Sequence, residues 1–328
     1  MQPFEFVVAD SPASARALVR EVDGARYYAG GTTLVDLMKG GVETPPRVVD
    51  ISHLALAGVT LRPDGVRIGA LARNSDVAND ATIAARFPAL AQALLSGASG
   101  QIRNAATIGG NLLQRTRCSY FRETRWNCNK RIPGSGCDAL AGFNRGHAVL
   151  GANDACIATY PGDMAVALSA LSAHVVVEGD GGERTIAIDD LFLLPGDTPQ
   201  HEHALAHGDL IVAVELRFAA AHERSQYLKV RDRASYEFAL VSAACGVELA
   251  GGTIRSARLA LGGVATVPWH VPEAEDALAG AAPGAEAFRH AAELALAGAV
   301  PRAHNAFKIE LAKRAIVRVL ESVCGGAA

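Results

Sequence analysis

Residues 27–34 read Tyr-Tyr-Ala-Gly-Gly-Thr-Thr-Leu, and this turn decides how the first part of the chain is interpreted. A strand pattern over 26–28 leads into it, and a helical pattern over 34–38 follows. Glycine lets the backbone approach an anion closely, and successive N–H groups before a helix favour a pyrophosphate. Thr32 and Thr33 add hydroxyl donors. Alone, the turn does not distinguish a phosphate site from a structural bend, because neither Gly-x-Gly-x-x-Gly nor a Walker loop is present.

A second turn of the same character lies about 75 residues later, where residues 107–111 read Thr-Ile-Gly-Gly-Asn. Two such turns can line one diphosphate from opposite sides. The pair therefore predicts nucleotide binding, which neither turn supports alone.

Strand and helix patterns alternate around these turns. Strands are expected over 48–51, 66–68, 175–178, 184–188 and 210–217, and helices over 74–79, 81–96 and 163–172. Residues 239–249 and 254–262 form an antiparallel pattern, and an amphipathic helix follows Pro301. The alternation favours an α/β or α+β fold over a helical bundle.

The six cysteines are unevenly distributed. Cys118, Cys128, Cys137 and Cys156 are separated by nine, eight and eighteen residues, whereas Cys245 and Cys324 stand apart and are expected to be structural. A clustered set in a chain without a secretory signal indicates metal binding more than disulfides. The close Cys-x-x-Cys pairs of zinc knuckles are missing, and the wide gaps suit a 4Fe–4S cluster held by four cysteines.

The segment around these cysteines is basic and lacks periodicity, so we expect a loop organised by a metal. Between residues 115 and 145 only Glu123 and Asp138 oppose seven cations, which are Arg115, Arg117, Arg122, Arg125, Lys130, Arg131 and Arg145. Such charge would offset thiolates. Tyr120, Phe121 and Trp126 are expected to shield the metal. Zinc, inert thiols and a nucleic-acid-binding patch remain alternatives.

Other polar groups carry weaker signals. His201, His203 and His207 share a polar segment without a metalloprotease carboxylate, so a solvated surface is favoured over a metal site. Lys229, together with Arg231 and Arg233, is compatible with a charged strand face or with a phosphate or flavin contact. No Ser/His/Asp or Cys/His catalytic constellation can be assigned.

Composition excludes several classes of function. The formal charge of −3 gives no global attraction to nucleic acid or an anionic membrane. No apolar run reaches about 18 uncharged residues, so no membrane span is expected. Residues 1–10 lack the basic and apolar regions of a secretory signal, which predicts a cytoplasmic protein. A protein exported already folded, on the signal of a partner, would show the same N-terminal sequence and would be periplasmic.

Together the motifs resemble the FAD-binding subunit of molybdenum hydroxylases, the family of xanthine dehydrogenase, carbon monoxide dehydrogenase and aldehyde oxidoreductases. The resemblance rests on both glycine turns, on Pro161-Gly162-Asp163, on Asp209-Leu210-Ile211 and on Lys229, and it runs nearly the whole length. The cysteine segment is similar to that of the FAD and 4Fe–4S subunit of bacterial periplasmic-type aldehyde oxidoreductases. The 4-hydroxybenzoyl-CoA reductase flavin subunit has a different cysteine spacing.

The resemblance implies an α+β fold with a two-lobed FAD-binding domain of the vanillyl-alcohol-oxidase (PCMH) type over 1–220, interrupted by a cluster insertion at about 115–157. A smaller α+β domain of the carbon monoxide dehydrogenase flavoprotein type would follow over 221–328. It also implies the ligands of both cofactors. FAD contacts are expected from Tyr27, Tyr28, Ala29, Gly30, Gly31, Thr32, Thr33, Leu34, Thr107, Gly109, Gly110, Asn111, Asp163, Ile211 and Lys229. The 4Fe–4S ligands are Cys118, Cys128, Cys137 and Cys156.

The implied function is electron transfer within an aldehyde oxidoreductase. Electrons from a molybdenum centre on a large subunit would pass through 2Fe–2S clusters on a small subunit to FAD on this chain, and then to a terminal acceptor. The assembly would be a heterotrimer or a dimer of heterotrimers, without nucleic acid or membrane. A self-contained flavin oxidoreductase of the same fold and a zinc-containing nucleic-acid-binding module are the alternatives. The aldehyde, the acceptor, the cluster potential and its place on the electron route do not follow from the sequence.

Overall fold

The computed structural model describes residues 1–325, and the chain begins with a small parallel sheet. Its strands are β1 (Glu5–Val8), β2 (Arg26–Tyr28) and β3 (Arg47–Asp50), in the order β1-β3-β2. Helices α1 (Pro12–Arg20) and α2 (Leu34–Lys39) connect them. The first glycine turn lies between β2 and α2, at the carboxyl end of a parallel strand, where ligands of α/β sheets commonly bind.

A five-stranded antiparallel sheet forms the second lobe, in the order β4-β5-β8-β6-β7. Its strands are β4 (Val59–Arg62), β5 (Gly65–Gly69), β6 (His174–Gly179), β7 (Gly182–Ala187) and β8 (Leu210–Arg217). The helices of this lobe are α3 (Asn74–Ala78), α4 (Ala81–Arg86), α5 (Pro88–Ser96), α6 (Gly100–Arg103), α7 (Ile108–Leu112), α9 (Asp163–Ala170) and α10 (Ile188–Leu191).

The central strands of this sheet are buried on both faces. In β6, Val175 and Val177 point into the core beneath the helices, whereas Val176 faces the small parallel lobe. Because side chains alternate along a strand, one apolar strand can join two cores. The lobes are therefore packed against each other through the sheet.

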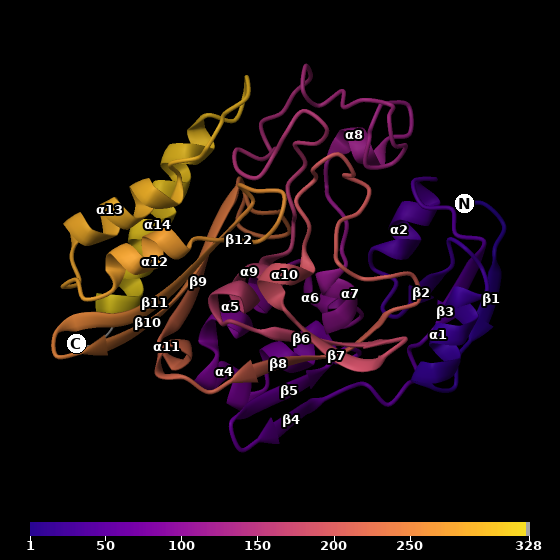
Figure 1. Ribbon diagram of the computed structural model, residues 1–328, viewed down its shortest axis with the longest axis horizontal. Helices are drawn as coiled ribbons and strands as arrows, with labels where there is room; N and C mark the ends of the chain where they lie inside the picture. The colour runs from indigo at the N-terminus through magenta and orange to yellow at the C-terminus, as the bar shows by residue number, and fades with distance from the viewer. Residues whose placement is uncertain (326–328) are drawn as a thin grey trace.

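The last part of the chain is a four-stranded antiparallel sheet covered by helices on one face (Figure 1). Its strands are β9 (Ser225–Val230), β10 (Val241–Ala250), β11 (Thr253–Gly262) and β12 (Trp269–His270), and its helices are α11 (Ala220–Glu223), α12 (Pro272–Leu278), α13 (Ala285–Ala295) and α14 (Phe307–Gly325). The opposite face contacts α5 and α9 of the preceding lobe.

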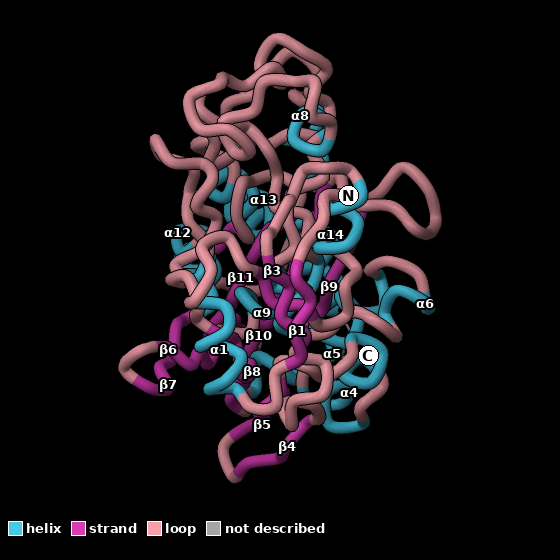
Figure 2. The backbone as a smooth tube through the Cα atoms, turned by 90° about the vertical axis from the view of Figure 1, so that its right-hand side faces the viewer, coloured by secondary structure: helices cyan, strands magenta, loops and turns pink. Residues whose placement is uncertain are grey.

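Residues 115–157 protrude as a long excursion of loops, which we call the insertion (Figure 2). Its one helix is α8 (Ser119–Arg122). One β-bridge pairs Cys128 with Cys137, and a second pairs Leu150 with Ala265 outside the insertion. The expected lack of periodic structure is thus confirmed.

Two predicted elements differ from the structure. The turn expected over 107–111 is largely the short helix α7, whose N-cap Thr107 accepts a hydrogen bond from the N–H of Gly110. The helix expected over 81–96 is broken into α4 and α5 at Phe87, because Pro88 cannot continue the first helix and instead begins the second. The predicted antiparallel pair is confirmed as β10 and β11. No helix within residues 1–325 has the length and apolarity to cross a bilayer.

Candidate functional site

A cleft of about 530 Å³ lies between the small parallel lobe and the antiparallel lobe. Both glycine turns line it, the first through residues 29–34 and the second through Thr107, Gly109 and Gly110. Tyr27 and Ile211 line it as well. Its volume is in the range of small-molecule and cofactor sites. The structure therefore brings together two motifs that are far apart in the sequence.

Close backbone contacts explain the glycines. A Cβ on Gly30 would stand 2.0 Å from the carbonyl oxygen of Ala105, so only glycine lets the first turn lie against the segment that leads into the second. Gly31 has φ +67°, in the left-handed region that glycine adopts without strain. On the second turn, Gly109 packs against Ala70, and its N–H donates to the carbonyl of Ala70.

The first turn carries unused hydrogen-bond donors. Within the described part of the chain, the backbone N–H groups of residues 30–33 donate to no protein acceptor. A run of unpaired amides beside a cleft is an anion-binding arrangement. The turn therefore fits the phosphates of a dinucleotide such as FAD.

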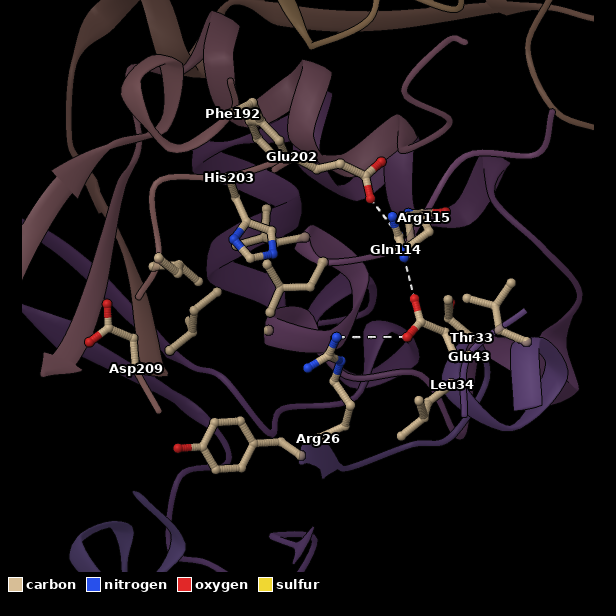
Figure 3. A pocket seen from close by; sticks show the side chains of 18 of the residues that line it. Arg26, Thr33, Leu34, Glu43, Gln114, Arg115, Phe192, Glu202, His203 and Asp209 are labelled. Carbon is tan, nitrogen blue, oxygen red and sulfur yellow. Dashed lines mark hydrogen bonds and ion pairs between the residues drawn. The ribbon is translucent and has the colours of Figure 1, made fainter. Parts of the chain in front are cut away.

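Charged side chains cross one end of the cleft (Figure 3). The Arg115 guanidinium pairs with both Glu43 and Glu202, and Arg26 approaches Glu43 at 3.8 Å. Lys130 Nζ donates to Glu202 Oε1 at 2.9 Å. These partners hold the pKa of Glu202 below its usual value although burial acts to raise it.

Two predicted cofactor residues lie on the turns without lining the cleft. The Tyr28 ring packs against Gly31 and meets Phe6 edge-on, with ring centroids 6.1 Å apart. The Asn111 side-chain oxygen accepts a hydrogen bond from Gln114 at 2.8 Å. Both residues shape the turns from behind.

Asp163 and Lys229 are brought to each other instead of to the glycine turns. Lys229 Nζ lies 2.8 Å from Asp163 Oδ2, and the two side chains are 4% and 10% exposed, respectively. The Tyr227 hydroxyl donates to the same carboxylate, and Lys229 also donates to the carbonyl of Ser96. Neither residue lines the cleft. Their ion pair connects α9 to β9 and so links the antiparallel lobe to the C-terminal sheet. A direct FAD contact for either residue remains a prediction.

The four clustered cysteines surround one small apolar cavity next to the cleft. Cys128 and Cys156 are buried, and Cys118 and Cys137 are half-buried. Cys156 and Lys130 line both the small cavity and the cleft, so the two sites are adjacent. Within the described residues, no carboxylate lines the small cavity. Among residues 1–325, no group of three or more His, Cys, Asp or Glu side chains is arranged to hold a metal ion.

Apolar and polar neighbours surround the sulfurs. Phe121 is buried against Cys128 and Leu37, as expected of a shielding residue, whereas Trp126 is 38% exposed. His147 Nε2 lies 3.2 Å from Cys118 Sγ. Burial raises the pKa of Cys118 to about 12 and that of Cys156 to about 11, so these groups are thiols unless a cation stabilises the thiolates.

Arginine and lysine side chains organise the loop backbone here. Arg131 donates to the carbonyls of Tyr120 and Phe121 at 2.8 and 2.6 Å. The fully buried Lys308 of α14 donates to the carbonyls of Gly146, His147 and Gly263. Burial lowers the pKa of Lys308 to about 7, while three acceptors favour the ammonium form with its three N–H groups.

The sequence interpretation missed the charged lining of the cleft. Glu43, Arg115 and Glu202 lie in irregular segments, and the pairs they form are 72 and 87 residues apart in the chain. No local pattern signals such pairs. The three histidines read as solvated surface also line the cleft: His201 and His207 are exposed, and burial lowers the pKa of half-buried His203.

Comparison with known proteins agrees with this geometry. Residues 2–216 match the model of the FAD-binding domain in molybdopterin dehydrogenase, and residues 226–323 match the carbon monoxide dehydrogenase flavoprotein C-terminal domain. The chain is 47% identical over 322 residues to the aldehyde oxidoreductase FAD-binding subunit PaoB of Escherichia coli (strain K12), covering 98% of both chains. It is 27% identical to the glyceraldehyde dehydrogenase medium chain of Sulfolobus acidocaldarius, covering 83% of this chain and 79% of that one.

A solved structure shows the same architecture. Carbon monoxide dehydrogenase from Hydrogenophaga pseudoflava superposes with a TM-score of 0.78 at 27% identity, over the full length of both chains. The α+β fold expected from the sequence is thus confirmed. The chain belongs to the family of FAD-binding subunits of molybdenum hydroxylases, and it is an oxidoreductase subunit with an FAD-binding domain.

Proposed function

We propose that this chain is the FAD-carrying electron-transfer subunit of a molybdenum-dependent aldehyde oxidoreductase and that its insertion holds a 4Fe–4S cluster. The observation that carries the proposal is the adjacency of two sites: a cleft lined by both glycine turns and a cavity lined by four cysteines, with Cys156 and Lys130 in the walls of both. The likeness to an aldehyde oxidoreductase subunit over 98% of the chain supports the substrate class.

For FAD, we assign the diphosphate to the unpaired amides of residues 30–33 and to the second turn at Thr107, Gly109 and Gly110. Thr32 and Thr33 supply hydroxyl donors, and Tyr27 and Ile211 complete the apolar wall. Ala29 and Leu34 also line the cleft, and Tyr28 and Asn111 shape the two turns. Contacts of Asp163 and Lys229 with FAD remain predicted. When bound, FAD supplies redox chemistry that exchanges one or two electrons.

For the cluster, Cys118, Cys128, Cys137 and Cys156 are the assigned ligands. In a 4Fe–4S cluster each cysteine binds a different iron, so the four sulfurs stand farther apart than the ligands of one ion. This spacing accounts for a set of thiols that surrounds a common cavity without forming a single-ion site. His147 would donate to Cys118 Sγ, and Lys130 would offset thiolate charge.

The chain acts with partners in this proposal. We assign a large molybdenum-cofactor subunit and a small 2Fe–2S subunit, as a heterotrimer or a dimer of heterotrimers. We also place the boundary between the FAD-binding and C-terminal domains at about residue 220, which is supported by the end of β8 at Arg217 and the start of β9 at Ser225. The family assignment favours this function over a zinc-containing nucleic-acid module.

The test is cofactor analysis of the chain purified without oxygen. About one FAD and four irons per chain are expected, together with flavin and iron–sulfur absorbance. Zinc in place of iron would refute the cluster assignment while leaving the FAD assignment intact. Aldehyde oxidation by the isolated chain would instead support the self-contained flavin oxidoreductase.

A further inference from the structure

Residues 192–209, which we call the strap, form one wall of the cleft without any regular helix or strand. The strap leaves α10 and returns to β8, so both ends are fixed in the antiparallel lobe. Between these ends, Phe192, His203 and Asp209 are among its residues that face the cleft (Figure 3). A wall of this kind can move without disturbing the sheet, because its middle contributes no strand to it.

The middle of the strap is attached to the insertion. Lys130 Nζ donates to the carbonyl of Pro199 and to Glu202 Oε1, at 2.9 Å in each case. The Asn153 side chain donates to the carbonyl of Gly196 at 2.8 Å. The loop that carries the cysteines therefore holds the wall of the neighbouring cleft.

Glu202 is the charged centre of this attachment. Its carboxylate pairs with Arg115 and Lys130, and Arg115 in turn pairs with Glu43 on the opposite lobe. The side chains of Glu43, Arg115, Lys130 and Glu202 are only 12%, 21%, 10% and 24% exposed. Ion pairs shielded to this degree are stronger and less screened by salt than surface pairs.

The base of the strap has an ion pair of a different kind. Asp209 pairs with Arg184 of β7, within the lobe to which the strap is anchored. That contact cannot join the two sides of the cleft, whereas the chain of contacts from Glu202 through Arg115 to Glu43 does. Lys130 also lies two residues from Cys128, so disorder of the cysteine loop would remove a partner of Glu202.

From these contacts we propose that Glu202 is a positioning residue that latches the strap over FAD and links the order of the insertion to FAD retention. The proposal rests on the assignment of FAD to this cleft. In this proposal, Arg115 and Lys130 of the insertion keep the cleft closed, in addition to any positive charge that they supply to the cluster.

The test is the rate of FAD release from the holoprotein, followed as flavin fluorescence that recovers on dilution. Glu202→Gln removes the charge and keeps the shape, and we expect release about tenfold faster, because loss of one partner of a shielded pair acts on dissociation. Asp197→Asn is the matched control. Asp197 is exposed on the same strap and forms no ion pair within residues 1–325, so release should be unchanged.

Two further measurements separate a latch from a general loss of structure. Lys130→Met should also speed release, and the double variant with Glu202→Gln should release FAD more slowly than the product of the two single effects predicts, because both changes remove one shared interaction. The thermal midpoint of the FAD-free Glu202→Gln protein should match that of the Asp197→Asn control.

The outcomes distinguish this proposal from the proposed function. A wild-type protein that contains no FAD would refute the assignment of FAD to the cleft. A wild-type protein with full FAD content, whose release is no slower than that of Glu202→Gln, would refute the latch alone.

Discussion

The glycine-lined cleft and the cysteine insertion adjoin each other but are built in different ways. The cleft lies between regular elements, and its first turn is positioned at the end of a parallel strand and against the carbonyl of Ala105. The insertion has one short helix and takes part in two isolated β-bridges. Its carbonyls are bound by long cationic side chains, chiefly Arg131 and Lys308.

The difference shows two ways to position a cofactor. In the cleft, the sheet and helices satisfy most backbone groups, so a few unpaired amides remain available to a ligand. In the insertion, side chains must satisfy the carbonyls, and Lys130 supplies positive charge near Cys156. The cleft should therefore tolerate loss of its ligand better than the insertion does, and the following predictions test that contrast.

The largest effect is expected from Cys128→Ser. Cys128 is 7% exposed and lines the small cavity, so its loss should abolish nearly all iron absorbance while FAD is partly retained. Absorption spectra with iron and flavin assays measure both. Cys324→Ser, a half-buried site on α14, is the control and should keep its iron. Full iron content in the Cys128 variant would overturn the ligand assignment.

A smaller but still large effect is expected from Lys308→Met. The side chain is 0% exposed, and the change removes its hydrogen bonds to the carbonyls of Gly146, His147 and Gly263, which should lower the free energy of unfolding by about 2–4 kcal/mol. Urea unfolding provides the measurement. Lys313→Met on the same helix removes only an exposed pair with Glu310 and should cost less than about 0.5 kcal/mol. An equal loss of unfolding free energy in both variants would contradict the role of Lys308 in holding the insertion.

Gly30→Ala tests the cleft side of the comparison. Its Cβ would overlap the Ala105 carbonyl and push the first turn away from the second, so FAD affinity should fall by about tenfold or more, as the geometry of several amide contacts is lost. Titration of the apoprotein with FAD measures the affinity. Gly100→Ala, where a Cβ meets nothing within 4 Å, should bind FAD like the wild type. If both variants bind FAD equally well, the close approach of the two turns does not contribute to FAD affinity.

The smallest effect is a pH response of the latch. The pKa of Glu202 is lowered in the folded protein, so its interaction with Arg115 and Lys130 persists above the usual glutamate value and is lost only as pH falls through the lowered one. FAD release should thus stay constant from about pH 7 to pH 5 and accelerate only below about pH 4.3. If FAD release accelerates between pH 7 and pH 6, a histidine and not Glu202 controls the release rate.

Local signals in the sequence were sufficient for much of the fold. Residues 107–111 were predicted to form a turn, but they lie mainly in the short helix α7 (Ile108–Leu112), which begins after Thr107. The strand pair 241–250 and 253–262 followed from the alternation of apolar residues. The convergence of four cysteines followed from their clustering and from the basic loop around them. The break at Phe87 was missed because the apolar stripe continues through Pro88 on both helices.

The charged contacts could not be predicted in the same way. Contacts of Asp163 and Lys229 with FAD stay a prediction, but their ion pair with each other was not anticipated. A carboxylate in this buried position needs a partner, and β9 supplies the lysine. Glu202 lies in a polar stretch that reads as surface, and only tertiary contacts with Arg115 and Lys130 give it a role. Ion pairs between irregular segments depend on the whole fold, so no short pattern encodes them.

The hydrogen bonds from Lys308 to the insertion bear on the order in which parts of the protein reach their final structure. The acceptors at Gly146 and His147 lie 162 and 161 residues earlier in the chain. A ribosome therefore makes every cysteine of the insertion long before it makes the side chain that fixes the loop behind them, because synthesis runs from the N-terminus. The loop can therefore reach its final conformation only after residue 308 has been made, and we expect the proposed cluster to be inserted after that point in synthesis.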